Sequence, residues 1–183
     1  MARDRSQPAS AADTRQLIID AALEIILSAG ATQATARRIA ETASVSPGTV
    51  TYHFASINEL LAEAFAKMSA DIASVFTARL KAAPDLAAAR ETVVDLIYGA
   101  VTPLSRQMMF SFELYTFVSR NPEYRGLAEE WMERSRQALH LHFDLPTAKA
   151  VDALLEGFTI HNFLNRQHVS REDVARAVSA LTR

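Results

Sequence analysis

Cysteine is absent from this sequence of 183 residues, and only five glycines are present. Without cysteine the chain has no disulfide, no thiolate metal site and no cysteine nucleophile. The sequence also lacks a glycine-rich phosphate loop, an H-E-x-x-H pair and a G-x-S-x-G elbow, which are common marks of enzymes. His140 and His142 are two residues apart, so on a helix they point roughly 200° apart and do not easily share a metal. We therefore expect no enzyme, no catalytic residues, no metal and no cofactor.

Long hydrophobic segments are also missing. No apolar run approaches the ~20 residues that cross a bilayer. The polar start, MARDRSQPASAADTR, has no apolar core of the kind that a signal peptide needs. Apolar residues still make up 49% of the chain, enough to bury a core. The sequence therefore predicts a folded cytoplasmic protein with no membrane partner.

The sequence also lacks an excess of positive charge. The net charge is −2, which is unlike that of most nucleic-acid binders. The first sixty residues carry Arg3, Arg5, Arg15, Arg37 and Arg38 against Asp4, Asp13, Asp20, Glu24, Glu41 and Glu59. Any interaction with DNA must therefore rest on local geometry and not on bulk charge.

Helical spacing of apolar residues occurs along nearly the whole chain, and strand alternation is almost absent. Asp13 with Gln16 resembles a capping box, and Gly30 is placed to end the first helix. Two short helices are expected to follow. Thr35 is the expected N-cap of the first, and Ser46, which precedes a proline, is the expected N-cap of the second. The capping box Ser56–Glu59 is expected to start a long fourth helix. Further helices are expected over 86–100, 103–119, 123–143 and 147–165, and a last one after Ser170.

These helices predict an all-α fold of about nine helices. Three short helices form an N-terminal helix-turn-helix domain, and a long fourth helix joins it to a C-terminal helical bundle. We expect a disordered tail over 1–12, a DNA-binding domain over 13–65, and a domain for ligand binding and dimerisation over 66–183.

The segment SVSPGTVTYHF, residues 44–54, has the composition of a DNA-reading helix. In a helix-turn-helix the second helix lies in the major groove. Gly48 lets a backbone approach closely, Thr49 and Thr51 offer hydroxyls and methyls to base edges, and Tyr52 and His53 suit phosphates. The same pattern also fits a simple turn between packed helices, with Val50 and Phe54 as core. The candidate DNA-binding residues are Thr35, Arg37, Ser46, Pro47, Gly48, Thr49, Thr51, Tyr52 and His53.

The stretch TARRIAETASVSPGTVTYHFASINELLAEAF resembles the helix-turn-helix of the TetR family of bacterial transcriptional regulators. The matching positions are Thr35, Ile39-Ala40, Val45-Ser46, Tyr52-His53-Phe54, Ser56 and Leu60-Leu61. Further along, ALLEGFTIHNFLN is similar to the helix that these proteins commonly use for dimerisation. The resemblance implies a homodimeric repressor that binds a pseudo-palindromic operator in double-stranded DNA and is released by a small-molecule effector.

Two positions depart from the family pattern. Ile57 stands where the family commonly has a phosphate-binding lysine, so DNA binding should lose about one unit of salt slope. Thr51 replaces a large aromatic residue or leucine, and the operator can be unusual as a result. Arg3 and Arg5 either enter the minor groove in compensation or belong to a solvated tail.

The second half of the chain combines apolar, aromatic and methionine residues on several helix faces, as either a plain core or a cavity wall does. Glu113 lies within that apolar stretch and needs either a ligand or a structural partner, and His161 is similarly ambiguous. The expected pocket wall is Met68, Ile72, Tyr98, Met108, Phe112, Tyr115, Trp131, Phe158 and Asn162.

A dimer interface is expected on the helix over 147–165, which has more apolar surface than one side can bury. Its candidate residues are Val151, Leu154, Leu155, Gly157 and Phe158. The alternative to a regulator is a helical module that binds a small molecule or a protein and has a weakened or vestigial DNA-binding head.

Overall fold

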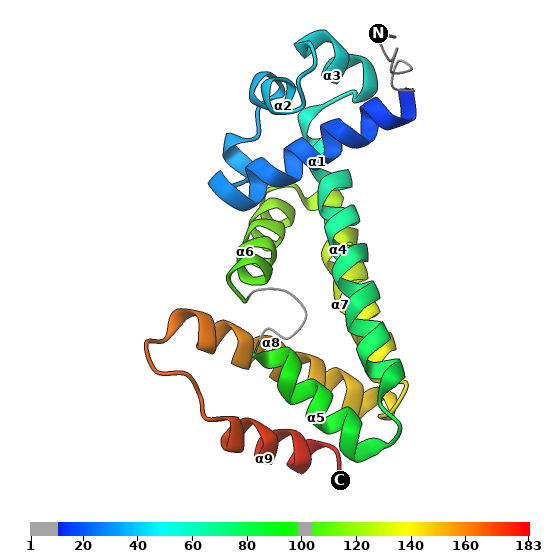
Figure 1. Cartoon of the computed structure of the whole chain (residues 1–183), viewed down its shortest axis with the longest axis vertical. Coiled ribbons are helices and arrows are strands. Elements are labelled where there is room, and N and C mark those ends of the chain that lie inside the picture. Colours follow the sequence, from blue (N-terminus) through cyan, green and yellow to red (C-terminus); the bar gives the residue numbers. More distant parts are fainter. Residues whose placement is uncertain (1–10, 99–103) are drawn as a thin grey trace, which may run out of the picture. The chain divides into compact units, whose positions relative to one another are not determined.

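The computed structural model describes residues 11–98 and 104–183. Arg3, Arg5 and most of the expected tail, together with Pro103, lie outside these residues. Within them the secondary structure is entirely helical, with nine α-helices, two short 3-10 helices and no strand (Figure 1). The expectation of an all-α fold with about nine helices is confirmed. None of the helices in the described ranges combines the length and apolarity that crossing a bilayer requires.

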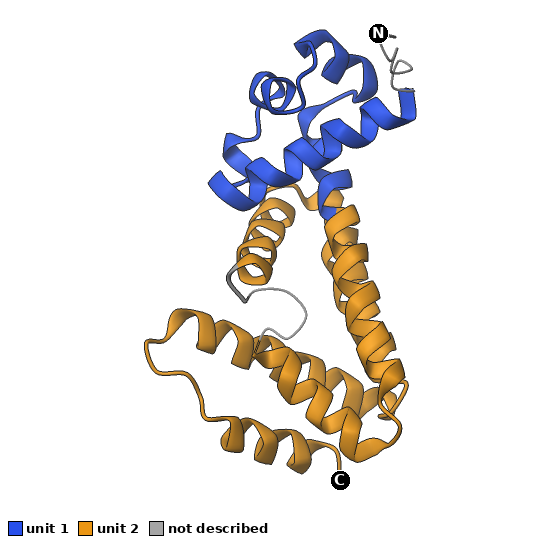
Figure 2. Cartoon of the chain, in the orientation of Figure 1, with its two compact units in different colours: residues 1–65 blue, residues 66–183 orange. Residues whose placement is uncertain are grey.

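The chain divides into two compact units between Phe65 and Ala66 (Figure 2). Unit 1 contains α1 (Ala11–Ala29), the 3-10 helix Ala31–Gln33, α2 (Ala36–Thr42), α3 (Pro47–His53) and the start of α4 (Ile57–Ala82). Unit 2 contains the rest of α4, then α5 (Leu86–Ile97), α6 (Leu104–Arg120), the 3-10 helix Pro122–Tyr124, α7 (Gly126–Leu139), α8 (Leu145–Leu164) and α9 (Arg171–Leu181).

The core of unit 1 forms where α1, α2 and α4 bring their apolar stripes together. Ile18 and Ile26 of α1, Ile39 of α2 and Leu60 of α4 are completely buried, as their helical spacing predicts. Gly30 ends α1 with a φ of 91°, a conformation that favours glycine.

The start of α1 corrects one expectation. Asp13 is not the N-cap, because the helix already begins at Ala11. Ala11 and Ala12 are strong helix formers, and Asp13 lies in the first turn, where a carboxylate is favoured by the helix dipole.

The core of unit 2 lies between α5, α7, α8 and α9. Its completely buried members include Val93, Ile97, Leu139, Val151 and Val174. α8 packs against α5, α6, α7 and α9, so its apolar residues are needed on several sides.

Two helices of unit 2 have bounds that differ from those expected. The segment predicted as one helix over 123–143 is a 3-10 helix followed by the shorter α7, which ends at Leu139 with His140 as its C-cap. Pro146 does not break the chain, because α8 begins at Leu145 and accommodates the proline in its first turn.

Polar contacts hold α9 to α5. Arg171 forms ion pairs with Glu91 and, at 2.6 Å, with Asp95. The Tyr98 hydroxyl donates to the carbonyl of Val169 at 2.6 Å. These contacts fix the loop that leads from α8 into α9.

Two leucines near the end of α7 test the assignment of the core. Leu139 is 0% exposed and Leu141 is 48% exposed. We expect Leu139→Ala to lower the free energy of unfolding by about 2–5 kcal/mol, because it leaves a cavity, and Leu141→Ala by less than about 0.5 kcal/mol. Urea unfolding followed by the fluorescence of Trp131, the sole tryptophan and a residue of unit 2, measures both. Equal effects of the two substitutions would contradict this core.

Candidate functional site: nucleic-acid interface and ligand pocket

The short helix α3 is capped as its sequence predicts. The Ser46 hydroxyl accepts from the backbone N–H of Thr49 at 3.1 Å, and Pro47 takes the first helical position. The hydroxyls of Ser46 and Thr49 lie 2.9 Å apart in a second hydrogen bond. Serine and proline therefore determine where α3 begins.

The inner face of α3 is anchored by apolar burial. Val50 and Phe54 are both buried in unit 1, as expected of core positions. The guanidinium of Arg15 lies 4.7 Å from the centre of the Phe54 ring and pairs with Glu63. α1 and α4 thus hold the end of α3 in place.

The outer face of α3 carries the residues expected to read DNA. Tyr52 is 82% exposed although its side chain is large and aromatic. Its ring contacts the His53 ring edge to face, with centroids 5.1 Å apart. The Thr51 hydroxyl donates to the carbonyl of Gly48 at 3.1 Å. None of these contacts buries the phenol of Tyr52, which stays available to a partner.

Gly48 is not required by the protein itself. A Cβ built at this position would meet only the Ser46 hydroxyl, at an ordinary 3.6 Å. Within the described residues the only glycine with positive φ is Gly30. The absence of a side chain at Gly48 therefore leaves open space on the outer surface of α3.

The start of α2 adds polar groups to unit 1. Thr35 caps the helix, accepting from the N–H of Arg38 at 3.3 Å. Arg37 pairs with Glu41 at 3.0 Å, and both side chains are exposed, so the pair contributes little to stability. Arg38 is also exposed, and among the described residues its guanidinium has no ion-pair partner. Sequence reasoning left Arg38 out of the candidate set, although its place next to Arg37 in the first turn of α2 was a usable signal.

The beginning of α4 is capped by Ser56 and Glu59. Ser56 accepts from the N–H of Glu59 at 3.1 Å, and the Glu59 carboxylate accepts from the N–H of Ala55 at 2.8 Å. Ile57, an apolar residue beside this cap, is partly exposed. This exposed position is where the family pattern has a lysine.

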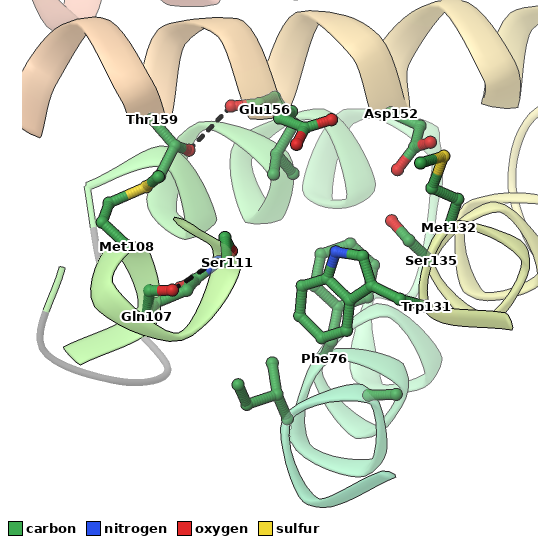
Figure 3. Close-up of a pocket in the computed structure, with 13 residues that line it drawn as sticks. Phe76, Gln107, Met108, Ser111, Trp131, Met132, Ser135, Asp152, Glu156 and Thr159 are labelled. Atoms are coloured by element: carbon green, nitrogen blue, oxygen red, sulfur yellow. Dashed lines mark hydrogen bonds between the residues drawn. The ribbon is translucent and has the colours of Figure 1, made fainter. Parts of the chain in front are cut away.

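Unit 2 contains a pocket between α4, α6, α7 and α8 (Figure 3). Its walls are mainly apolar, and two carboxylates enter it from α8. The lining residues are Ile72, Ala73, Phe76, Gln107, Met108, Ser111, Trp131, Met132, Ser135, Asp152, Leu155, Glu156 and Thr159.

Two hydroxyls of the pocket are satisfied by their own helices. Ser111 donates to the carbonyl of Gln107 at 3.1 Å, and Thr159 donates to the carbonyl of Leu155 at 2.7 Å (Figure 3). Neither hydroxyl needs a ligand to complete its hydrogen bonding.

Three residues of the expected pocket wall lie in the lining, namely Ile72, Met108 and Trp131. Tyr115 does not line the pocket but donates its hydroxyl to Glu156, which does. Burial, followed by the hydrogen bond to Glu156, raises the pKa of Tyr115, so the phenol stays protonated at neutral pH.

The other expected wall residues lie elsewhere. Met68 is buried in α4, Phe112 packs against Phe163, and Phe158 packs on the core of unit 2. Tyr98 and Asn162 both bond to the backbone of Val169. None of these five residues lines this pocket. The polar residues Asp152 and Glu156 were missed because nothing in the sequence distinguishes them from surface carboxylates.

The expected dimer residues differ in their burial. Val151 and Leu155 are buried within the core of unit 2, whereas Leu154 and Phe158 pack against it and keep part of their surface exposed. A dimer interface on α8 stays a prediction. Gly157 is half-buried, and no atom lies within 4 Å of a Cβ built there.

Comparisons with known proteins account for both units. The family model described as bacterial regulatory proteins of the tetR family matches residues 18–64. The model described as a tetracyclin repressor-like C-terminal domain matches residues 84–183. The chain belongs to the TetR family of transcriptional regulators. The predicted family is thereby confirmed, and the helix-turn-helix of unit 1 is the family's DNA-binding element.

Individual members of the family show how far the similarity extends. The chain is 39% identical over 106 residues to the transcriptional regulator SrpR of Pseudomonas putida, a match that spans 56% of this chain and 47% of that protein. The chain thus matches about half the length of this curated relative. The crystal structure of the transcriptional regulator SCO7518 from Streptomyces coelicolor A3(2) is 41% identical, has a TM-score of 0.86, and covers 92% of this chain and 98% of its own.

A third similar structure holds a ligand. The multidrug binding protein EbrR in complex with ethidium is 27% identical, has a TM-score of 0.78, and covers 93% of this chain and 99% of its own. The same protein has been solved with proflavin and with malachite green. Ligand binding therefore occurs in a protein of this fold.

Gly48 provides a test of the outer surface of α3. Because a Cβ at this position meets no obstacle in the chain, Gly48→Ala should stabilise unit 1 by about 0.5–1 kcal/mol through helix propensity. Thermal unfolding followed by circular dichroism measures the shift. A marked loss of stability would show that Gly48 is needed for the fold, and its absent side chain would then carry no functional meaning.

Proposed function

We propose that this protein is a homodimeric repressor that binds a pseudo-palindromic DNA operator through residues 13–65 and is released when a small-molecule effector binds within residues 66–183. The observation that carries the DNA-binding half is the exposed Tyr52 on α3. A large aromatic side chain that adds nothing to the core is typical of a binding surface. Such a regulator acts in the cytoplasm and needs no catalytic activity.

In this proposal α3 enters the major groove. Gly48 lets the DNA backbone approach, Thr49 and Thr51 contact base edges, and Tyr52 and His53 donate to phosphates. Thr35 and Arg37 at the start of α2 contact the opposite wall of the groove. Arg37 can exchange its exposed partner Glu41 for a phosphate at little cost, because surface ion pairs are weak.

The pocket supports the effector-dependent half of the proposal. It has apolar walls with few polar groups, as small-molecule sites do, and the similar protein EbrR binds proflavin and ethidium. An effector can release DNA only if it binds the DNA-competent and the DNA-incompetent states with different affinity. Linkage then requires operator DNA to weaken effector binding by the same factor.

The direct test is the selection of genomic DNA fragments by the purified protein at two salt concentrations. The proposal expects an enriched pseudo-palindrome whose affinity falls as salt rises, because each neutralised phosphate releases counterions. The absence of any enriched sequence, both with and without added cell extract, would favour the alternative of a binding module with a vestigial DNA-binding head.

Tyr52→Phe tests the contact that carries the proposal. Loss of one phosphate hydrogen bond should weaken operator binding by about 3–10-fold, without changing stability, since the phenol is exposed. Tyr124→Phe, which makes the same chemical change in unit 2, is the matched control and should bind normally. Fluorescence anisotropy with a labelled operator measures both affinities, and an unaltered affinity of Tyr52→Phe would remove Tyr52 from the interface.

The salt dependence separates neutral from charged contacts. Tyr52→Phe should leave the slope of log affinity against log salt unchanged, whereas Arg37→Gln should reduce it by about one unit. If neither the affinity nor the slope changes in Arg37→Gln, Arg37 contributes only its ion pair with Glu41.

A further inference from the structure

Two carboxylates enter the pocket of unit 2 from one face of α8. Asp152 and Glu156 are one helical turn apart, so their side chains project in the same direction. Figure 3 shows both pointing into the space that the Trp131 ring also faces. Among the described residues that line this pocket, none is cationic.

Asp152 already has a cationic partner. The Nε of Arg136 lies 3.0 Å from its carboxylate, and both side chains are mostly buried. The ion pair cancels the charge of Asp152, so this residue adds little net field to the cavity.

Glu156 has no such partner. It accepts a hydrogen bond from the neutral phenol of Tyr115, and in the part of the chain that the structure describes it forms no ion pair. Arg79 of α4 does not line the pocket and pairs with neither carboxylate. Glu156 is half-buried in a mainly apolar cavity, and an opposite charge is the ligand group that stabilises such a carboxylate best.

The other walls suit the rest of such a ligand. Trp131 and Phe76 offer aromatic surface, and the tryptophan ring is the best partner for a cation over its face. Met108 and Met132 are unbranched and adapt to irregular shapes. The combination is selective for a positive charge attached to apolar groups.

We propose that the pocket binds hydrophobic organic monocations, such as aromatic quaternary ammonium compounds, and that Glu156 selects for their charge. This inference rests on the proposed function, because it names the chemical class of the effector. Asp152 has a positioning role, in which its ion pair with Arg136 joins α7 to α8.

The size of the pocket favours a small probe. Its volume is about 50 Å³. Benzyltrimethylammonium is a one-ring cation with a compact charged group. Neopentylbenzene has the same shape with carbon in place of nitrogen, so the pair differs in charge alone.

The fluorescence of Trp131 reports on binding, because the sole tryptophan lines the pocket. We expect wild-type protein to bind benzyltrimethylammonium at least about tenfold more tightly than neopentylbenzene. Glu156→Gln keeps the hydrogen bond to Tyr115 but removes the charge, and it should weaken the cation by about tenfold or more while sparing neopentylbenzene.

Two control variants sharpen the test. Glu133→Gln removes the same charge from an exposed position of α7 and should leave both affinities unchanged. Tyr115→Phe removes the donor to Glu156 and should leave cation binding equal or tighter. If Glu156 served only to hold Tyr115, Tyr115→Phe would weaken the cation, whereas Glu156→Gln, which keeps that hydrogen bond, would retain full cation affinity.

The proposal is overturned if wild-type protein binds neither benzyltrimethylammonium nor the larger cation ethidium, if the two matched probes bind equally, or if Glu156→Gln retains full cation affinity. The DNA selection is a separate readout. Salt-dependent operator binding without cation binding would refute this inference alone, whereas cation binding without any operator would refute the proposed function.

Discussion

The burial of Val50 and Phe54 is the constraint on which the candidate DNA-binding surface depends. α3 has seven residues, far fewer than an isolated helix needs to be stable in water. Its position is determined by two apolar anchors, by the serine cap at its start, and by Arg15 over the Phe54 ring. Because these groups occupy the inner face and the ends, the exposed side chains of α3, such as Thr51 and Tyr52, are available to a partner.

α8 has the corresponding role in unit 2. It contacts α5, α6, α7 and α9, and so it must be apolar on several sides. Val151 and Leu155 fill the core, while Asp152 and Glu156, each one residue further along, turn toward the pocket. The same helix therefore stabilises the unit and supplies the charged groups of its cavity. A change at either carboxylate alters the pocket without removing an apolar residue from the core.

Local signals predicted much of the fold because they act over a few residues. Thr35, Ser46 and Ser170 cap the helices that follow them, as their hydroxyls indicated. The prediction that Asp13 is the N-cap of α1 was wrong, because a carboxylate is favourable in the first turn of a helix as well as at its cap. The alanines before Asp13 extend α1. The apolar residues of α8 are a less specific signal. An apolar helix face looks the same in sequence whether a neighbouring helix of the same chain or a second copy covers it.

The sequence by itself determined the helical class, the order of the helices and the helix-turn-helix, since each follows from spacing and capping within short segments. Its motif residues indicated the family by resemblance. Only the tertiary structure decided which side chains share the pocket. Ile72, Trp131 and Glu156 are far apart in the chain and come from three helices, so their meeting depends on how those helices pack. The tertiary structure also decided which carboxylate is neutralised. Asp152 has an ion-pair partner and Glu156 does not, because Arg136, on another helix, lies beside Asp152.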